Sequence, residues 1–185
     1  MSHRLGDVVT TALRVLDDHG LADLTMRRLA AELDVRPSAL YHHVASKQAL
    51  LAAVADEILA RGARDLPTGD WRTRHHAAAT ALRDALLAYR DGAEVVAAVQ
   101  ALGPAERDPR LQVHEALTGL PDDVRRVGAT TTVIFVLGHA QDEQLATGAA
   151  SAGATDGRAR LDAASFDAGL RLIEDGLAAR VALQG

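Results

Sequence analysis

The 185-residue chain contains no cysteine, which excludes disulfide bridges and cysteine-ligated metal centres. Aromatic residues make up only 3% of the chain, so a hydrophobic core must consist mainly of leucine, valine and alanine. The most apolar run, residues 130–137, is far shorter than the roughly 20 residues that a membrane-spanning helix needs. The N-terminus mixes Arg4, Asp7 and Thr10 with its apolar residues and does not resemble a signal peptide. We therefore expect a cytoplasmic protein without a membrane segment.

Hydrophobic residues make up 48% of the chain, and its length is enough for one large or two small domains. Alanine favours helix, and no alternating strand pattern of convincing length is present. Residues 62–70 contain Gly, Pro and Gly within nine positions, which makes them the best candidate boundary. The sequence therefore predicts an all-α fold with an N-terminal domain (1–47), a linking helix (48–61) and a larger C-terminal domain (71–185).

Helical periodicity, capping residues and helix breakers locate the individual helices. The predicted helices cover residues 5–19, 25 to about 34, 38–44, 46–61, 71–90, 94–102, 110–120, 122–145 and a final stretch that Ser165 begins as N-cap. Residues 147–164 are rich in Ala, Gly, Ser and Thr, and we expect a mobile loop there.

Residues 25–47 predict two short helices joined by a tight turn. Thr25 is a suitable N-cap for the first helix, and Pro37 is tolerated only in the first turn of the second. The second helix would bury Leu40 and Val44 at a spacing of four residues and expose Ser, Tyr and His side chains. A helix-turn-helix of a DNA-binding protein has this form, but so do helical domains that never contact DNA.

The net charge of −5 argues mildly against a nucleic-acid-binding protein, but the charges are unevenly distributed. Residues 1–48 carry six basic and six acidic residues, so the excess acid lies in the remainder of the chain. Within 25–47 there are four basic and two acidic residues. A small DNA-reading domain needs only a local positive face, so this pattern remains compatible with DNA binding.

The segment LTMRRLAAELDVRPSALYHHVASKQALL (residues 24–51) resembles the DNA-binding domain of the tetracycline-repressor (TetR) family of bacterial regulators. This resemblance implies base contacts by one group of residues: Arg27, Pro37, Ser38, Ala39, Tyr41 and His43. It implies backbone contacts by Thr25, His42 and Lys47, and Arg28 completes the expected DNA-binding set.

Trp71 and residues 81–95, 135–144 and 165–177 extend the resemblance to the regulatory domain of the family. The resemblance implies a homodimer in which the helix 122–145 and the final helix pair with their copies in a four-helix bundle. We expect the stripe formed by Phe166, Leu170, Ile173 and Leu177 to face that interface.

The resemblance also implies a small-molecule effector that weakens DNA binding when it enters the regulatory domain. The expected ligand-binding residues are Ala78, Leu82, Val96, Gln100, His114, His139 and Asp142. Where tetracycline repressors use histidine, asparagine and a magnesium-binding histidine, this chain has Ala63, Ala78 and Val96. Since alanine and valine cannot hold Mg²⁺, tetracycline–Mg²⁺ is not expected to be the effector, and a more apolar molecule is.

The sequence shows no phosphate-binding loop, metalloprotease motif or nucleophile elbow, so we expect neither an enzyme nor a cofactor. The pairs His42–His43 and His75–His76 are poorly placed for chelation, because adjacent helical side chains point about 100° apart. His139 and Glu143 could share an ion, but two ligands make a weak site, and we expect no metal. The leading interpretation is a ligand-released repressor. The alternatives are a ligand-responsive activator of the same fold, a helical enzyme and a dimeric protein that does not bind DNA.

Overall fold

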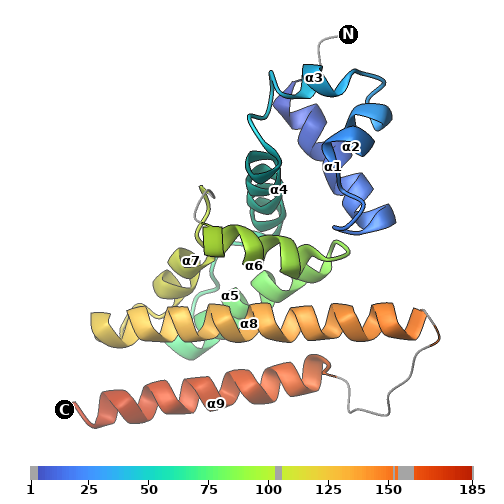
Figure 1. Cartoon of the computed structure of the whole chain (residues 1–185). Coiled ribbons are helices and arrows are strands. Elements are labelled where there is room, and N and C mark those ends of the chain that lie inside the picture. The colour runs from blue at the N-terminus through green and yellow to red at the C-terminus, as the bar shows by residue number, and fades with distance from the viewer. Residues whose placement is uncertain (1–3, 103–105, 152, 154–160, 185) are drawn as a thin grey trace. The chain divides into compact units, whose positions relative to one another are not determined.

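The computed structural model describes residues 4–102, 106–151, 153 and 161–184. Within these ranges every regular element is a helix, and the only bridge is an isolated one between Thr118 and Leu120 (Figure 1). The predicted all-α fold class is confirmed. The helices are α1 (Leu5–His19), α2 (Met26–Glu32), α3 (Pro37–Leu40), α4 (Lys47–Gly62), α5 (Trp71–Leu87), α6 (Gly92–Leu102), α7 (Pro109–Ala116), α8 (Asp122–Ser151) and α9 (Ala163–Ala182).

The chain forms two compact units. The first contains Met1–Arg61 and Ala85–Arg107, and the second contains Gly62–Asp84 and Asp108–Gly185. The first unit therefore holds α1–α3, nearly all of α4, and also α6, which the sequence-based boundaries placed in the C-terminal domain. The turn before α6 explains this grouping, because it is hydrogen-bonded to the turn that follows α1.

The contact between these two turns is built from backbone amides and carboxylates. The Leu21 N–H donates to Asp91 Oδ2 at 2.8 Å, and the Arg90 N–H donates to Asp17 Oδ1 at 3.2 Å. Gly20 lies between them with a φ of 81°, and a Cβ atom there would come within 2.7 Å of Asp91 Oδ2. Glycine is therefore required at this helix end for both its backbone conformation and its lack of a side chain.

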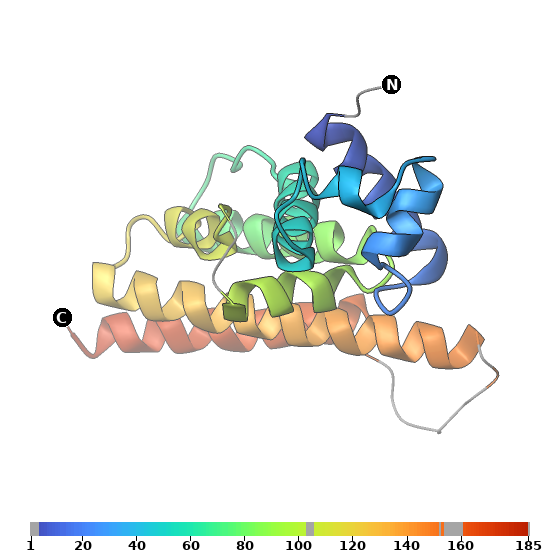
Figure 2. The same cartoon turned by 45° about the horizontal axis from the view of Figure 1, so that its top comes forward.

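In the second unit, α8 and α9 lie side by side and run in opposite directions (Figures 1 and 2). Val133 and Val136 of α8 and Phe166 and Leu170 of α9 are buried, so the two helices share an apolar core. Gly169 lets the helices approach closely, since a Cβ atom there would meet the Phe135 ring at 2.5 Å. The α8–α9 pair is thus stabilised within a single chain.

This packing corrects one sequence-based expectation. Phe166, Leu170 and Leu177 are at most 8% exposed in a single chain, and Ile173 is half-buried. The stripe was predicted to face a second subunit, and that prediction is wrong, because helical spacing locates a buried face without saying which chain buries it.

Several helix boundaries also differ from the prediction, and three of these differences concern the helix-turn-helix and the α8–α9 pair. The helix expected over 38–44 covers only Pro37–Leu40, and residues 41–43 form turns. Helix α8 continues to Ser151, so the first part of the expected loop at 147–164 is helical; positions 152 and 154–160 lie outside the described residues. Asp162, not Ser165, is the N-cap of α9: its carboxylate accepts the Ser165 N–H at 2.9 Å. An ionised carboxylate is the better acceptor at a helix start.

Candidate nucleic-acid interface

Residues 25–47 fold as a helix-turn-helix whose inner face is apolar. Leu29 of α2, Leu40 of α3 and Val44 are buried, with at most 4% exposure, and they hold the two short helices against the rest of the first unit. The Thr25 hydroxyl accepts the Arg28 N–H at 3.1 Å, which confirms the predicted N-cap. Asp34 forms the turn with a φ of 53°, an unusual value that aspartate tolerates better than most residues.

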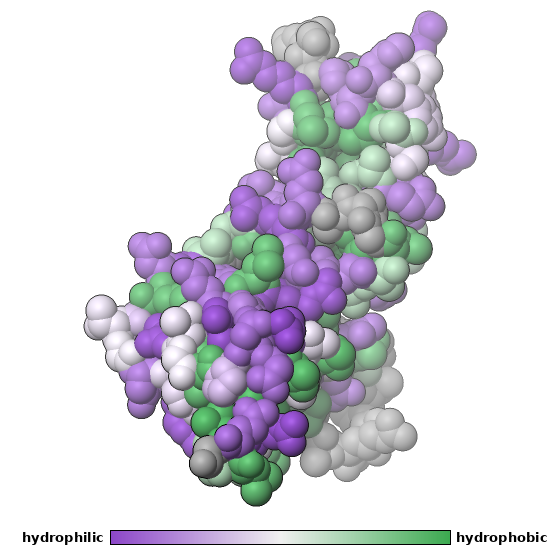
Figure 3. Space-filling view, turned by 90° about the vertical axis from the view of Figure 1, so that its left-hand side faces the viewer, coloured by the Kyte–Doolittle hydropathy of each residue, from purple (hydrophilic) through white to green (hydrophobic). Residues whose placement is uncertain are grey.

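The outer face of this motif carries most of the residues expected to contact DNA. Tyr41 is 53% exposed, while Arg28 and Ala39 are half-buried. The remaining exposed members of the set are Thr25, Arg27, Pro37, Ser38, His42, His43 and Lys47. At the top of Figure 3, hydrophilic side chains project from the end of the unit that carries these helices.

Ion pairing divides the basic residues of this region into two groups. The Arg28 side chain donates to Glu32 Oε1 at 3.2 Å and lies 2.6 Å from Nε2 of His19. Arg14 of α1 donates to the other carboxylate oxygen of Glu32 at 2.9 Å. Because both arginines hydrogen-bond to it, the pKa of the Glu32 carboxyl is lowered from its ordinary value. This network connects α1 to α2, and the guanidinium of Arg28 takes part in it through its contacts with Glu32 and His19.

The other group of basic residues is left without such partners. Arg27, Arg36 and Lys47 are exposed, and none of them makes an ion pair or side-chain hydrogen bond to another described residue. Arg27 of α2, Arg36 at the N-cap of α3 and Lys47 at the start of α4 are thus three exposed cations that no other described residue neutralises. A surface of this kind suits a polyanion.

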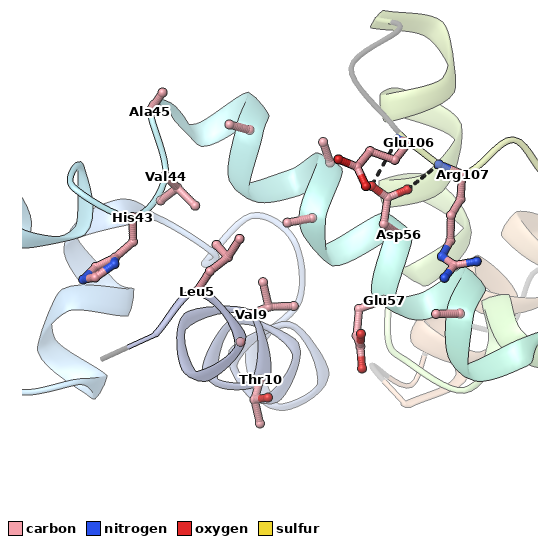
Figure 4. Close-up of a pocket in the computed structure, with 15 residues that line it drawn as sticks. Leu5, Val9, Thr10, His43, Val44, Ala45, Asp56, Glu57, Glu106 and Arg107 are labelled. Carbon is pink, nitrogen blue, oxygen red and sulfur yellow. Dashed lines mark hydrogen bonds between the residues drawn. The ribbon is translucent and has the colours of Figure 1, made fainter. Parts of the chain in front are cut away.

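A groove of about 660 Å³ lies beside the helix-turn-helix in the first unit (Figure 4). Leu5 and Val9 of α1 line one side, and small residues of α4, mostly alanines, line the other. At its edge, Asp56 of α4 accepts the backbone N–H groups of Glu106 and Arg107 at 3.1 and 2.8 Å. Sequence reasoning missed this contact, because a carboxylate that caps a segment 50 residues away leaves no local pattern.

The residues expected to bind a ligand are divided between the two units. Val96, buried, and Gln100, half-buried, belong to the first unit, where the Gln100 amide donates to the Arg107 carbonyl at 3.0 Å. The other five belong to the second unit: Ala78, Leu82 and His139 are buried, His114 is half-buried and Asp142 is exposed. Their role in ligand binding stays a prediction.

His139 lies in an aromatic cluster of the second unit. Its ring centroid is 5.6 Å from that of Phe135 and 5.3 Å from that of Phe166, and its Nε2 is 3.2 Å from the Ser165 hydroxyl. Its Nδ1 lies 2.6 Å from Glu143 Oε1, an ion-pair distance without hydrogen-bond geometry. Glu143 in turn accepts two hydrogen bonds from Arg83.

The neighbouring residues His75 and His76 make different contacts in the structure. His75 is fully buried, with Nδ1 at 3.0 Å from Glu174 Oε1 and Nε2 at 2.8 Å from Thr132 Oγ1. His76 faces Asp167 instead, at 3.3 Å. His75 therefore links α5 to α8 and α9 as a structural group. No cluster of three or more His, Asp or Glu side chains suited to a metal ion occurs among the described residues.

Comparisons with known proteins agree with the helix-turn-helix and the helical second part. A family model described as "Bacterial regulatory proteins, tetR family" matches residues 8–54, and a second, "Tetracyclin repressor-like, C-terminal domain", matches residues 63–165. The class A tetracycline repressor protein from transposon 1721 of Escherichia coli is 35% identical over 197 residues, which cover 94% of this chain and 89% of the relative. The chain belongs to the TetR family. It is thus a member of a family of transcriptional repressors with a DNA-binding N-terminal domain and a ligand-binding C-terminal domain.

Solved structures of the TetR family extend this similarity to the whole chain. BioQ of Mycobacterium smegmatis shares 45% identity with a TM-score of 0.86, over 96% of this chain and 98% of that one. A BioQ structure with its double-stranded DNA operator shares 43% identity with a TM-score of 0.81, over 96% and 99% of the two chains. None of the helices in the described part of the chain is long and apolar enough to cross a membrane.

Proposed function

We propose that this protein is a homodimeric repressor that binds a near-palindromic operator through residues 25–47 of each subunit. The observation that carries the proposal is the exposed surface of the helix-turn-helix, which presents three cations that no described residue neutralises together with exposed Tyr and His side chains. In a dimer, the two recognition helices would enter successive major grooves on one side of the duplex. The half-sites are then about 34–36 Å apart, one helical turn.

Within this proposal, Arg27, Pro37, Ser38, Ala39, Tyr41 and His43 contact base edges. Thr25, His42 and Lys47 hold the DNA backbone. Thr25 can do so while it caps α2, because a hydroxyl oxygen that accepts the Arg28 N–H still has its own hydrogen to donate. Arg28 lies outside the contact set, since its guanidinium is engaged by Glu32 and His19.

The subunit interface is formed by faces of α8 and α9 that a single chain leaves exposed. On α8 the exposed or half-buried residues Val127, Thr131, Ile134, Gly138, Gln141 and Leu145 recur at spacings of four and three. Along α9 and its C-cap, one uncharged row of exposed residues recurs at similar spacing: Ala168, Leu172, Gly176, Ala179 and Leu183. Neither stripe contains a charge, and Leu172 is 75% exposed. Uncharged stripes at this spacing support a helical interface between two copies of the chain.

The effector is a mainly apolar molecule held by the regulatory domain, and tetracycline–Mg²⁺ is not that molecule. Ala78 and Val96 are buried and carry no oxygen or nitrogen ligand in their side chains, whereas Mg²⁺ requires oxygen-rich or water-bridged contacts. Effector binding would favour a form of the dimer that binds the operator less well. Tetracycline and Mg²⁺ are titrated into the protein–operator complex: we expect no release, and release of DNA at micromolar drug would contradict this part.

A selection of bound duplexes from random DNA tests the proposal as a whole. The expected product is a near-palindromic site that the purified protein binds selectively, with affinity that falls steeply as salt rises. Binding without sequence preference, or no binding at low salt, would reject it.

A further inference from the structure

The first unit of the structure assigns different tasks to two arginines that look equivalent in the sequence. Arg28 and Arg36 both lie within the helix-turn-helix, eight positions apart. Arg28 is half-buried and bonded to Glu32, while Arg36 is exposed with no ion pair or side-chain hydrogen bond among the residues described. Only one of the two guanidinium groups is thus available to a partner.

The position of Arg36 is fixed by the backbone around it. It has an extended conformation, with φ −74° and ψ 144°, and it directly precedes Pro37, the first residue of α3. Proline restricts the preceding residue to extended conformations, so the Cα of Arg36 is held in one place relative to α3. Asp34 is the nearest acidic residue in sequence, and no ion pair joins it to Arg36. The guanidinium therefore remains unneutralised next to the residues that are expected to read bases.

We propose that Arg36 is a base-reading, specificity-determining residue that takes a guanine in the major groove. Its five N–H donors in a planar fork match the O6 and N7 acceptors of guanine, the commonest specific arginine contact with DNA. Lys47, a compact point charge at the start of α4, suits a phosphate better. This inference rests on the proposed DNA-binding function and adds one residue to its base-reading set.

The test compares Arg36→Ala, Arg36→Lys and Arg28→Ala with the wild-type protein, each in a selection from random duplexes and in titrations at several salt concentrations. Arg36→Ala should bind the wild-type operator about 5- to 150-fold more weakly and lose a guanine preference at one position of each half-site. Arg36→Lys keeps the charge without the fork and should not restore that preference. Arg28→Ala should melt at a lower temperature but keep the same base preferences. Arg64→Ala, which removes an exposed charge outside the first unit, controls for net charge.

Each alternative outcome overturns the inference. If Arg36→Ala weakens binding to all sequences equally and reduces the salt slope, Arg36 contacts a phosphate. If Arg36→Ala selects the same operator with wild-type affinity, Arg36 makes no contact, although the proposed function stands. A wild-type protein that selects no operator would reject the proposed function together with this inference.

Discussion

Two surfaces of this protein are left without partners by the rest of the described chain. One carries unpaired cations, and the other exposes uncharged, mainly apolar residues. The face around α3 is polar and carries Arg27, Arg36 and Lys47 without intramolecular ion pairs among the described residues. The outer stripes of α8 and α9 carry no charge and expose Ile134 and Leu172 by 66% and 75%. Some other charges are neutralised within the chain, as in the bidentate Arg83–Glu143 pair.

The difference between these surfaces indicates what each of them binds. Unpaired cations can be neutralised by phosphates, and the counterions that this releases favour binding. Exposed leucine and isoleucine in a chargeless stripe gain free energy when another apolar surface covers them, at roughly 25 cal/mol per Å². A second copy of the chain presents the same stripe, which makes a two-fold pairing self-complementary. In the proposed function, the cationic surface therefore binds DNA and the apolar stripes form the dimer interface.

The largest expected effect comes from a charge placed on the inner instead of the outer face of α9. Leu170 is fully buried, so Leu170→Glu should prevent folding, because an unpaired buried carboxylate costs several kcal/mol. Circular dichroism should show lost helix or aggregation. A folded Leu170→Glu protein with a wild-type melting temperature would contradict the assignment of this residue to the core.

The matched change on the outer face is Leu172→Glu. It should leave the helix content and the monomer core intact while it separates the dimer, since two copies of the charge would meet in the interface. Light scattering should then report a monomer. Operator affinity should fall toward the non-specific level, about 10³-fold or more. A Leu172→Glu dimer with wild-type affinity would show that this stripe is not the interface.

A smaller effect on operator binding should distinguish the roles of two cations near α3, Arg27 and Lys47. Arg27→Ala should cost about 1–3 kcal/mol of operator binding and relax preference at one base pair, whereas Lys47→Ala should weaken all sequences alike and lower the salt slope by about one. Titrations on the selected operator and on a scrambled duplex distinguish the two. Equal loss on both duplexes for Arg27→Ala would remove it from the base-reading set.

Replacing the N-cap of α2, Thr25, tests how much this cap contributes to the stability of the helix-turn-helix. Thr25→Ala removes the acceptor of the Arg28 N–H and should lower the free energy of unfolding by about 0.5–2 kcal/mol, while Thr25→Ser should retain most of it. Urea unfolding of both variants measures the difference. Equal loss in the two variants would argue against a capping role.

The smallest expected effect is pH-dependent. The Arg14 and Arg28 hydrogen bonds lower the pKa of Glu32 in the folded state below its ordinary value of 4.5. The resulting stabilisation is therefore present above pH 4.5 and is lost as the pH falls through the lowered value. The melting temperatures of wild-type protein and Glu32→Gln should differ at pH 7 and converge in acid. A difference that grows on acidification would have the wrong sign.

The sequence predicted the fold class, the helix-turn-helix and most helix positions, because those depend on local periodicity, caps and breakers. Thr25 and Pro37 stand at the helix starts for which their chemistry predicts them. Length was predicted less well: α3 ends at Leu40, and α8 extends into an alanine- and glycine-rich stretch. Nothing in the local pattern marks these ends.

What the sequence could not show were contacts between distant residues. The grouping of α6 with α1–α4 depends on Asp91 and Leu21, which are 70 positions apart. Arg28 and Glu32 are four positions apart within α2, a spacing that favours their ion pair, whereas Arg36 follows Glu32 by four positions but lies beyond the end of that helix. The difference between the two arginines therefore depends on where α2 ends. The Leu170 stripe looked like an interface when it is the core of one chain.

The central claim is that one surface binds DNA while the other forms the dimer. Its most direct test is to measure the mass and the footprint of the wild-type protein on its selected operator. Light scattering of the complex should give two chains per duplex, and hydroxyl-radical cleavage should show two protected half-sites about one helical turn apart, roughly 34–36 Å. A single chain on a single half-site, or a protected region without two-fold symmetry, would contradict the account.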